Sequence, residues 1–312
     1  MIEFSDTQWA LILGGSSGFG LATAKKLARH GMSVCVVHRD RRGAMERINK
    51  EFEEIKGHGN GFVALNLDAL SDTGRETALD TLGEAMGSTG RVRLVMHSIA
   101  FGNLKPLAPV ADDPDQDNAI DVLASKLDMA PEDLRASVQE AFADGAAALH
   151  TLVRPEYSQY QLEDEDFERT IFAMGSSLVS WVRDVHQRGF FADDARVLGM
   201  TSEGNTTAWR GYAAVSAAKV TLESVCRAIA LEYAPYGIRA NTVQAGVTNT
   251  PALRVIPGSA QMLAVGALRN PLRRLTRPED VANFICLLCT DEAAWVNGAL
   301  LRVDGGECIA SQ

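Results

Sequence analysis

Short apolar segments rich in β-branched residues alternate along the chain with longer segments whose apolar positions recur at helical spacing. In the first third of the chain the expected strands are 9–14, 33–38, 61–67 and 92–98. The helices expected between them are 18–30, 41–56 and 72–86. Strands that alternate with helices in this way form a parallel sheet with helices on both faces.

The same alternation returns in the second half of the chain. The helices expected there are 164–187, 212–234 and one that begins at Pro278, and the strands are 195–202, 238–246 and 299–303. The sequence therefore predicts an α/β protein with a single doubly wound parallel sheet of the Rossmann type. The 312 residues are expected to form one domain spanning 1–312, which is long enough to bury a sizeable core.

The segment 103–163 interrupts the alternation. It holds Pro106, Pro109 and Pro114, an acidic stretch that reads ADDPDQDNAID, and then a helical pattern over 129–153. Such a segment is too long for an ordinary connection between elements. We expect a helical, acidic insertion within the domain, and a solvated surface decoration is the alternative interpretation.

Composition and charge narrow the functional classes. Hydrophobic residues make up 46% of the chain and charged residues 22%, which are ordinary values for a globular protein. The formal net charge of −10 argues against a broad surface for nucleic acid or an anionic membrane. No apolar run approaches the length of a membrane span, and the acidic N-terminal segment does not resemble a signal peptide.

The five cysteines are odd in number and scattered, which is typical of a reducing, cytoplasmic environment. Cys286 and Cys289 form a C-x-x-C pair, but they stand in an apolar helical pattern and no second pair accompanies them in the sequence. We therefore expect both cysteines to pack in the core, and we predict no metal site.

A glycine-rich turn joins the first expected strand to the first helix. The segment 13–20 reads LGGSSGFG, with the spacing Gly-x3-Gly-x-Gly. Such a turn lets backbone N–H groups and the positive end of a helix approach a pyrophosphate, so its position predicts a dinucleotide site. The residues of this turn expected to bind the cofactor are Gly14, Ser16, Ser17, Gly18, Phe19 and Gly20.

The end of the second strand is where the adenosine ribose of a dinucleotide is bound. An acid there would favour NAD, but the sequence has His38 and Arg39, followed by further arginines. Because guanidinium groups bind phosphate through paired hydrogen bonds, we predict NADPH, with NADH possible; alternatively, the arginines form an exposed helix face. Asp68, beside Ala69, either accepts from the adenine amino group or is an ordinary acid at a strand end.

The segment 211–219, GYAAVSAAK, holds a tyrosine and a lysine, the pair with which nicotinamide-dependent reductases polarise a carbonyl oxygen. Tyr212 lies seven residues before Lys219, whereas the more familiar offset of four falls on Val215. Offsets of four and seven depart from one helix face by roughly 40° and 20°, and they differ by about one turn along the axis. Tyr212 can therefore still face the cofactor, from a displaced position.

Six segments in order resemble the short-chain dehydrogenases/reductases: GGSSGFG, LNLD, HSIA, YAAVSAAK, RANTVQAG and VNGALLRVDGG. The resemblance covers nearly the whole chain apart from the insertion. Within that superfamily the chain looks most like the enoyl-acyl-carrier-protein reductases, on the strength of MHSIAF, the seven-residue offset and QAGVTNT. The further cofactor contacts that the resemblance implies are Ser98, Ile99, Ala100, Lys219, Gly246, Thr248 and Thr250.

Three features depart from the enoyl reductases. The glycine turn is of the short type, Ser202 stands where many of them carry a second tyrosine, and the insertion belongs to neither pattern. These departures bear on the substrate more than on the chemistry.

The resemblance implies that Tyr212 donates a hydrogen bond to the developing enolate oxygen of an enoyl thioester. Lys219 would bind the nicotinamide ribose and lower the pKa of the tyrosine. Ser202 either gives the same oxygen a second hydrogen bond or caps its strand, and the alternative for Tyr212 is a buried packing role. An acid set back from the hydride target fits an enoyl substrate, because charge develops on the more distant thioester oxygen.

We therefore expect a cytoplasmic, NADPH-dependent enoyl reductase of fatty-acid or polyketide synthesis, and by resemblance a homotetramer. The segment 251–277 is expected to be an irregular lid over the substrate. Its arginines Arg254, Arg269, Arg273 and Arg274 would suit an acyl carrier protein or coenzyme A, unless they are ordinary surface residues. The competing interpretations are a carbonyl reductase or hydroxy dehydrogenase of the same superfamily, and a dinucleotide-binding sensor without turnover.

Overall fold

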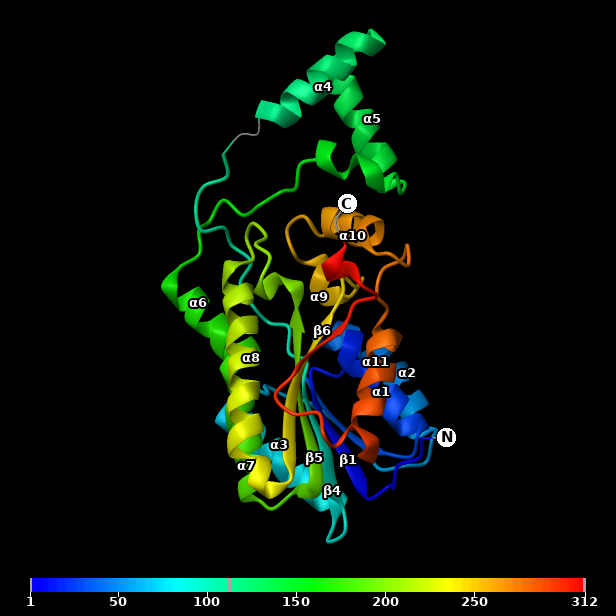
Figure 1. Cartoon of the computed structure of the whole chain (residues 1–312), viewed down its shortest axis with the longest axis vertical. Helices are drawn as coiled ribbons and strands as arrows, with labels where there is room; N and C mark the ends of the chain where they lie inside the picture. Colours follow the sequence, from blue (N-terminus) through cyan, green and yellow to red (C-terminus); the bar gives the residue numbers. More distant parts are fainter. Residues whose placement is uncertain (1, 112–113, 311–312) are drawn as a thin grey trace.

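The computed structural model describes residues 2–111 and 114–310, and its centre is a seven-stranded parallel sheet (Figure 1). The strand order is β3-β2-β1-β4-β5-β6-β7. The strands are β1 (Gln8–Leu13), β2 (Ser33–His38), β3 (Phe62–Asn66), β4 (Arg91–His97), β5 (Phe191–Ser202), β6 (Ile238–Ala245) and β7 (Leu300–Val303). Helices lie on both faces of this sheet, which confirms the predicted doubly wound α/β fold.

The central strands are continuous apolar runs because both of their faces are covered. Every residue of β2 is buried, and so are nearly all residues of β1 and β4. Parallel strands in this position do not need the alternation of apolar and polar residues that a half-exposed strand shows. The register pairs Leu13 with both Val37 and His97, which brings the carboxyl ends of β1, β2 and β4 to one edge of the sheet.

Two layers of helices bury two separate apolar clusters against the sheet (Figure 1). One layer consists of α1 (Gly18–Arg29), α2 (Met45–Lys56) and α11 (Pro278–Leu288). The other consists of α3 (Asp72–Met86), α7 (Ser177–Gln187) and α8 (Ala213–Glu232). The longest of these helices, α8, contacts both β5 and β6, so its N-terminus lies at the same edge as their carboxyl ends.

The helix expected over 164–187 is present over its full span, but it is not α-helical throughout. It consists of α6 (Asp164–Ile171), a π-helical turn (Phe172–Ser176) and α7. A Cβ atom on Gly175 would lie 2.9 Å from the carbonyl oxygen of Ala218, so the turn brings this helix directly against the backbone of α8. The prediction of a helix over 164–187 is thus confirmed, but the sequence pattern did not indicate the π-helical turn within it.

The segment 114–152 folds over a small apolar cluster of its own. It contains α4 (Pro114–Leu127), α5 (Pro131–Ala143) and the 3-10 helix η2 (Ala147–Leu152). The sequence analysis did not predict α4, although acids in its first turn favour a helix start. These helices lie beyond the carboxyl edge of the sheet, above α10 (Ser259–Arg269) (Figure 1).

The segment expected to be an irregular lid is largely helical. It forms α9 (Pro251–Arg254) and α10, with Pro257 and Gly258 at the break between them. The side chain of Gln261 on α10 donates to the carbonyl of Val153, so the insertion packs on this segment.

At the opposite edge of the sheet, three arginines converge on one aspartate. Arg93, Arg196 and Arg239 lie on β4, β5 and β6, and each forms an ion pair with Asp194. Arg93 and Arg196 also donate to backbone carbonyls at the C-terminal end of α11. Burial by itself raises the pKa of Asp194, but the hydrogen bond from Arg196 and the surrounding charges bring that pKa below its ordinary value. The network joins three strands to one helix.

We predict that Asp194→Ala lowers the free energy of unfolding by about 3 kcal/mol, because it leaves the buried guanidinium group of Arg196 without its counter-charge. Urea denaturation would measure the loss. The matched control is Asp193→Ala, at an exposed neighbour that forms no ion pair with the described residues, and it should change stability by less than about 0.5 kcal/mol. Equal losses in the two variants would contradict this role for the network.

Candidate functional site

The carboxyl ends of the strands open into a cleft of about 1000 Å³. It lies where the chain order reverses between β1 and β4, the place at which doubly wound sheets bind ligands. The cleft brings together nearly all the site residues predicted from the sequence. Those lining it are Gly14, Ser16, Ser17, Gly18, Phe19, His38, Arg39, Asp68, Ala69, Ser98, Ile99, Ala100, Ser202, Tyr212, Lys219, Gly246, Thr248 and Thr250. The exception, Gly20, lies behind the glycine turn.

The glycine turn is shaped by close backbone contacts. Gly14 has a φ of 88°, and a Cβ atom there would lie 2.5 Å from the carbonyl oxygen of Ser98. A Cβ atom on Gly20 would lie 2.2 Å from the carbonyl oxygen of Gly14. Ser17 is the N-cap of α1, yet its side chain makes no capping hydrogen bond. The start of α1 therefore offers free N–H groups and a hydroxyl to the cleft, which suits a pyrophosphate.

Two exposed arginines, Arg39 and Arg41, line the end of the cleft beside β2. Arg39 forms an ion pair with Asp68 at 2.8 Å, and its guanidinium lies 5.6 Å from the centre of the Phe101 ring. It precedes the next helical turn, which begins at Arg42, so Arg39 does not belong to an exposed helix face. An acid does stand nearby at Asp40, but its carboxylate contacts the ring of buried His38 at 2.9 Å. The most accessible charge at this end is thus a guanidinium.

The predicted helix 212–234 included Tyr212, but α8 begins one residue later. Tyr212 is the N-cap residue immediately before the helix, with φ −112° and ψ 4°. The argument from helix faces therefore applies to Lys219 but not to the tyrosine. The ring of Tyr212 packs against Gly204, where a Cβ atom would approach its Cε1 to 2.5 Å. Burial raises the pKa of the Tyr212 phenol, and the neighbouring Ser202 hydroxyl offsets part of that rise.

The ammonium group of Lys219 is buried, with 8% of the residue exposed, and it donates to the carbonyl oxygen of Met200 at 2.7 Å. Burial lowers the pKa of Lys219 to about 8, and the charge of Glu223 opposes the fall. Glu223 lies one helical turn further along α8. Its Oε1 accepts hydrogen bonds from Thr201 and Asn205, both at 2.6 Å. Glu223 therefore supports the lysine and also ties α8 to the end of β5.

His97, the last residue of β4, is fully buried beside this charge. Ser177 Oγ donates to the carbonyl of Ala173, so the contact of 3.0 Å between His97 Nε2 and Ser177 Oγ has the ring nitrogen as donor. Nδ1 then carries a lone pair, and it has no hydrogen-bond partner among residues 2–111 and 114–310. Burial, with a smaller effect from the charge of Lys219, lowers the pKa of His97 to about 3. The imidazole is neutral at physiological pH.

Ser202 ends β5 beside Tyr212. Its Oγ is buried and makes no hydrogen bond of ordinary geometry within the described parts of the chain. A capping role would have used that hydroxyl, and the 3-10 helix that follows, η4 (Glu203–Asn205), receives no side-chain cap from it. The hydroxyl is therefore available to a ligand in the cleft.

The sequence analysis missed two groups of polar residues at the site. Glu223 could have been found, because it stands four residues after Lys219 on the same predicted helix. The other group consists of Glu203 and Glu307, which line the cleft together with Arg269, a residue predicted only as a basic residue of the lid. Nothing in their spacing predicts that they meet.

Cys286 and Cys289 lie in the apolar cluster beneath α11, and neither is exposed. Burial raises the pKa of the Cys289 thiol to about 12.

None of the helices in the described chain is long and apolar enough to cross a membrane.

A doubly wound sheet with a glycine turn, a buried lysine and a tyrosine in one cleft defines a dinucleotide-dependent oxidoreductase. The chain belongs to the short-chain dehydrogenase/reductase family. The model described as "Enoyl-(Acyl carrier protein) reductase" matches residues 126–307, and the model described as "short chain dehydrogenase" matches residues 8–123.

Relatives of similar length differ in their reactions. The chain is 28% identical over 304 residues to a probable 2,4-dienoyl-CoA reductase of Bacillus subtilis, covering 96% of each chain. It is 26% identical over 297 residues to a cis-4-hydroxycyclohexanecarboxylate dehydrogenase of Sinomonas cyclohexanicum, covering 95% of each. The crystal structure of an enoyl-[acyl-carrier-protein] reductase (NADH) from Aquifex aeolicus shares the fold with a TM-score of 0.72 at 20% identity, covering 100% of this chain and 99% of that one.

We predict that acid destabilises the protein in part through His97. Its pKa is about 3 when folded and near the ordinary 6.5 when unfolded, so between these values only the unfolded chain takes up the proton. The free energy of unfolding should therefore decrease as the pH is lowered through this window. His97 should contribute about 1.4 kcal/mol of this decrease per pH unit.

Urea denaturation at several pH values between 6 and 4 would measure that slope. His97→Gln should flatten it, whereas the same change at exposed His58 should not. Parallel slopes for the wild type and His97→Gln would show that His97 does not remain neutral in the folded protein.

Proposed function

We propose that the protein is an NADPH-dependent reductase of the carbon–carbon double bond of an enoyl thioester. The observation that carries the proposal is the position of the acid. Tyr212 enters the cleft from the N-cap of α8, while the closer position, Val215, is 4% exposed and packs with Ala173, Met174 and Ala218. The phenol thus stands back from the position used for a carbonyl at the hydride-accepting carbon.

Each polar group of the site has a part in this reaction. When bound, NADPH would supply a hydride to the β-carbon of the substrate, and the α-carbon would take up a proton from water. Tyr212 donates a hydrogen bond to the thioester oxygen, on which negative charge develops. Ser202 gives that oxygen a second hydrogen bond from its unpartnered hydroxyl. Lys219 turns from the Met200 carbonyl toward the nicotinamide ribose, and its positive charge makes the phenol a stronger donor.

A second candidate is the reduction of a carbonyl group or the oxidation of an alcohol. Two observations favour it: Ser202 presents a hydroxyl rather than a second tyrosine, and one full-length relative is named as a hydroxy acid dehydrogenase. Paired assays with crotonyl-CoA and acetoacetyl-CoA separate the two reactions. A nucleotide sensor without turnover would reduce neither.

The choice of NADPH over NADH rests on Arg39. Its exposed guanidinium can exchange the ion pair with Asp68 for the 2′-phosphate, while Asp40 is engaged by His38. A ribose without that phosphate would gain little from the arginine.

The carrier, location and assembly form part of the same proposal. Two of the four lid arginines are already paired with acids, Arg269 with Glu203 and Arg274 with Asp280. An acyl carrier or coenzyme A would therefore meet Arg254 and Arg273. We propose a cytoplasmic homo-oligomer.

The outer faces of the molecule support association of several copies. Exposed apolar side chains lie along the π-helical turn, α7 and α8, at Phe172, Val179 and Val220.

We predict that Tyr212→Phe lowers kcat for crotonyl-CoA by about 100- to 1,000-fold, because one hydrogen bond to the enolate oxygen is lost in a dry site. The dissociation constant of NADPH, measured by fluorescence titration, should change little. Adding Val215→Tyr should not restore enoyl reduction, since that phenol would lie a turn away. Near-wild-type enoyl reduction by Tyr212→Phe would contradict the assignment.

We predict that Arg39→Asp weakens NADPH binding by about 10- to 100-fold, the effect of one charge-assisted hydrogen bond, and improves NADH binding. Direct titration of both nucleotides measures the effect without turnover. Arg42→Asp, in the adjacent exposed turn, is the matched control and should leave the NADPH-to-NADH preference unchanged. A wild-type protein that prefers NADH would show that the role proposed for Arg39 is wrong.

A further inference from the structure

One arginine connects the lid segment to the turn that carries Ser202. Arg269 is the last residue of α10, and its Nη2 forms an ion pair with Glu203, the residue directly after Ser202. The same nitrogen lies 3.7 Å from Oε1 of Glu307, in the C-terminal turn η7 (Glu307–Ile309). All three charged side chains line the cleft. The contact therefore joins the lid, the catalytic end of β5 and the C-terminal segment.

The cluster is mostly shielded from water, so its charges matter. The exposed fractions of the side chains are 19% for Arg269, 25% for Glu203 and 2% for Glu307. Without the arginine, two carboxylates would share a poorly solvated space, and each would be destabilised. Glu203 would then be pushed toward solvent, away from its place beside Ser202.

The turn formed by Ser202 and η4 is held from two sides. On the side of α8, Glu223 accepts from Thr201 and Asn205, which flank the turn. On the side of the lid, the Glu203 carboxylate forms an ion pair with Arg269. The backbone of the turn packs on the ring of Tyr212 at Gly204. A shift of the turn would therefore move both catalytic hydroxyls relative to each other.

The helix that ends at Arg269 also rests on the loop after β6. A Cβ atom on Gly266 would lie 2.8 Å from the Cβ of Val247, so α10 packs closely on this loop. The backbone N–H of Val247 donates to the Glu307 carboxylate at 3.1 Å. Arg269 thus occupies its position between the two acids only when α10 is seated on the loop.

We infer that Arg269 is a positioning residue that couples the seating of α10 to the geometry of the Ser202–Gly204 turn and hence to Tyr212. The inference rests on the proposed reductase function. When α10 lifts, Glu203 loses its cation and the turn loses its anchor on the lid side. The two hydroxyls then reach their working positions only beneath a seated lid, which links catalysis to closure over the substrate.

The test is a double-mutant cycle with Arg269→Met, Glu203→Gln and the double variant, assayed on whichever of crotonyl-CoA and acetoacetyl-CoA the wild type reduces. Each single change should lower kcat by about 10- to 100-fold, the range expected when reacting groups are misplaced by about 1 Å. The double variant should be no slower than the slower single variant, because both changes break the same interaction. Arg269→Lys should retain most of the rate, and the dissociation constant of NADPH should not change.

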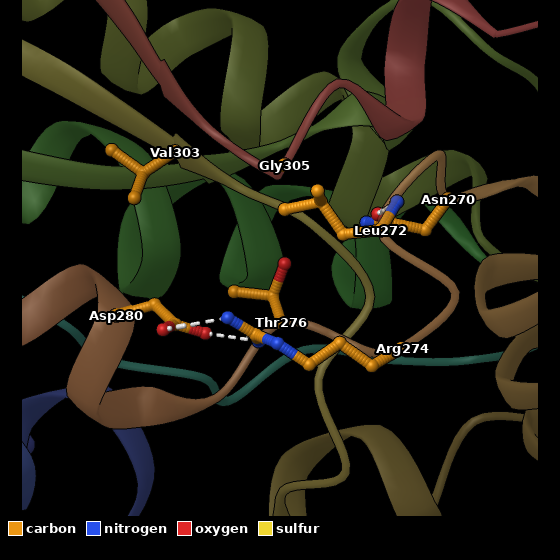
Figure 2. A pocket seen from close by; sticks show the side chains of 7 residues that line it. All are labelled: Asn270, Leu272, Arg274, Thr276, Asp280, Val303 and Gly305. Carbon is orange, nitrogen blue, oxygen red and sulfur yellow. Dashed lines mark hydrogen bonds and ion pairs between the residues drawn. The ribbon is translucent and has the colours of Figure 1, made fainter.

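A second ion pair at the base of the lid provides the matched control. Arg274 donates to Asp280 through two hydrogen bonds of 2.6 and 3.1 Å, as Figure 2 shows, and neither residue lines the catalytic cleft. Arg274→Met and Asp280→Asn should leave kcat unchanged. If Arg269→Met behaves like these controls, or if the losses of the two single variants multiply in the double variant, the coupling does not exist.

Hydrogen exchange on the free protein tests the coupling without any substrate. Arg269→Met should speed amide exchange in both α10 and the segment 201–205. Faster exchange in α10 alone would overturn the inference. A wild type that reduces neither thioester would contradict the proposed function, and the exchange result would still decide whether the lid and the turn are coupled.

Discussion

The burial of one ammonium group, that of Lys219, is the constraint on which the catalytic half of the cleft depends. A charge with so little contact with water is strongly destabilised unless polar groups replace its hydration. The carbonyl of Met200 replaces part of it, and the carboxyl of Glu223 supplies a compensating charge. Since burial brings the pKa of Lys219 down to about 8, the lysine remains mostly protonated at neutral pH with Glu223 in place. His97, buried beside it, stays neutral for the same reason.

The acid that supports the lysine also fixes the neighbouring turn, so charge and geometry are linked. Glu223 uses its Oε1 to hold Thr201 and Asn205, and these residues flank Ser202. A rotation of Glu223 would therefore disturb the lysine and the serine together. The opposite side of the turn depends on Arg269, which belongs to a segment outside the central sheet. The rigid core thus determines one side of the catalytic geometry, and a peripheral helix determines the other.

Apolar runs and glycine positions in the sequence predicted the structure correctly where local backbone geometry determines it. The buried runs of β1, β2 and β4 could only be strands covered on both faces, and Gly14 and Gly20 stand where a side chain would collide with backbone. Signals failed where distant contacts decide. The π-helical turn arises from the packing of Gly175 on α8, and α10 begins directly after a Pro-Gly pair that had suggested irregular structure.

The same distinction separates the residues of the site. A motif in the sequence singled out Tyr212 and Lys219, and Ser202 was noted because it stands at the end of a predicted strand. The helical periodicity did not show that α8 starts one residue after Tyr212, where Gly211, with a φ of 75°, ends the preceding loop. The meeting of Glu203, Arg269 and Glu307 has no local signal, since each lies at the end of a different segment.

Relatives of this chain include a probable dienoyl-CoA reductase and a hydroxy acid dehydrogenase, so membership of the family alone does not determine the reaction. The proposal made for this cleft depends on the environment of position 215. Val215 lines the cleft but has no proton to donate, and it packs in an apolar cluster with Met174 and Ala218. The proposed acid is therefore Tyr212, whose ring packs against the turn at Gly204. In the reaction that we propose, an acid displaced from position 215 suits a substrate whose charge develops away from the carbon that accepts hydride.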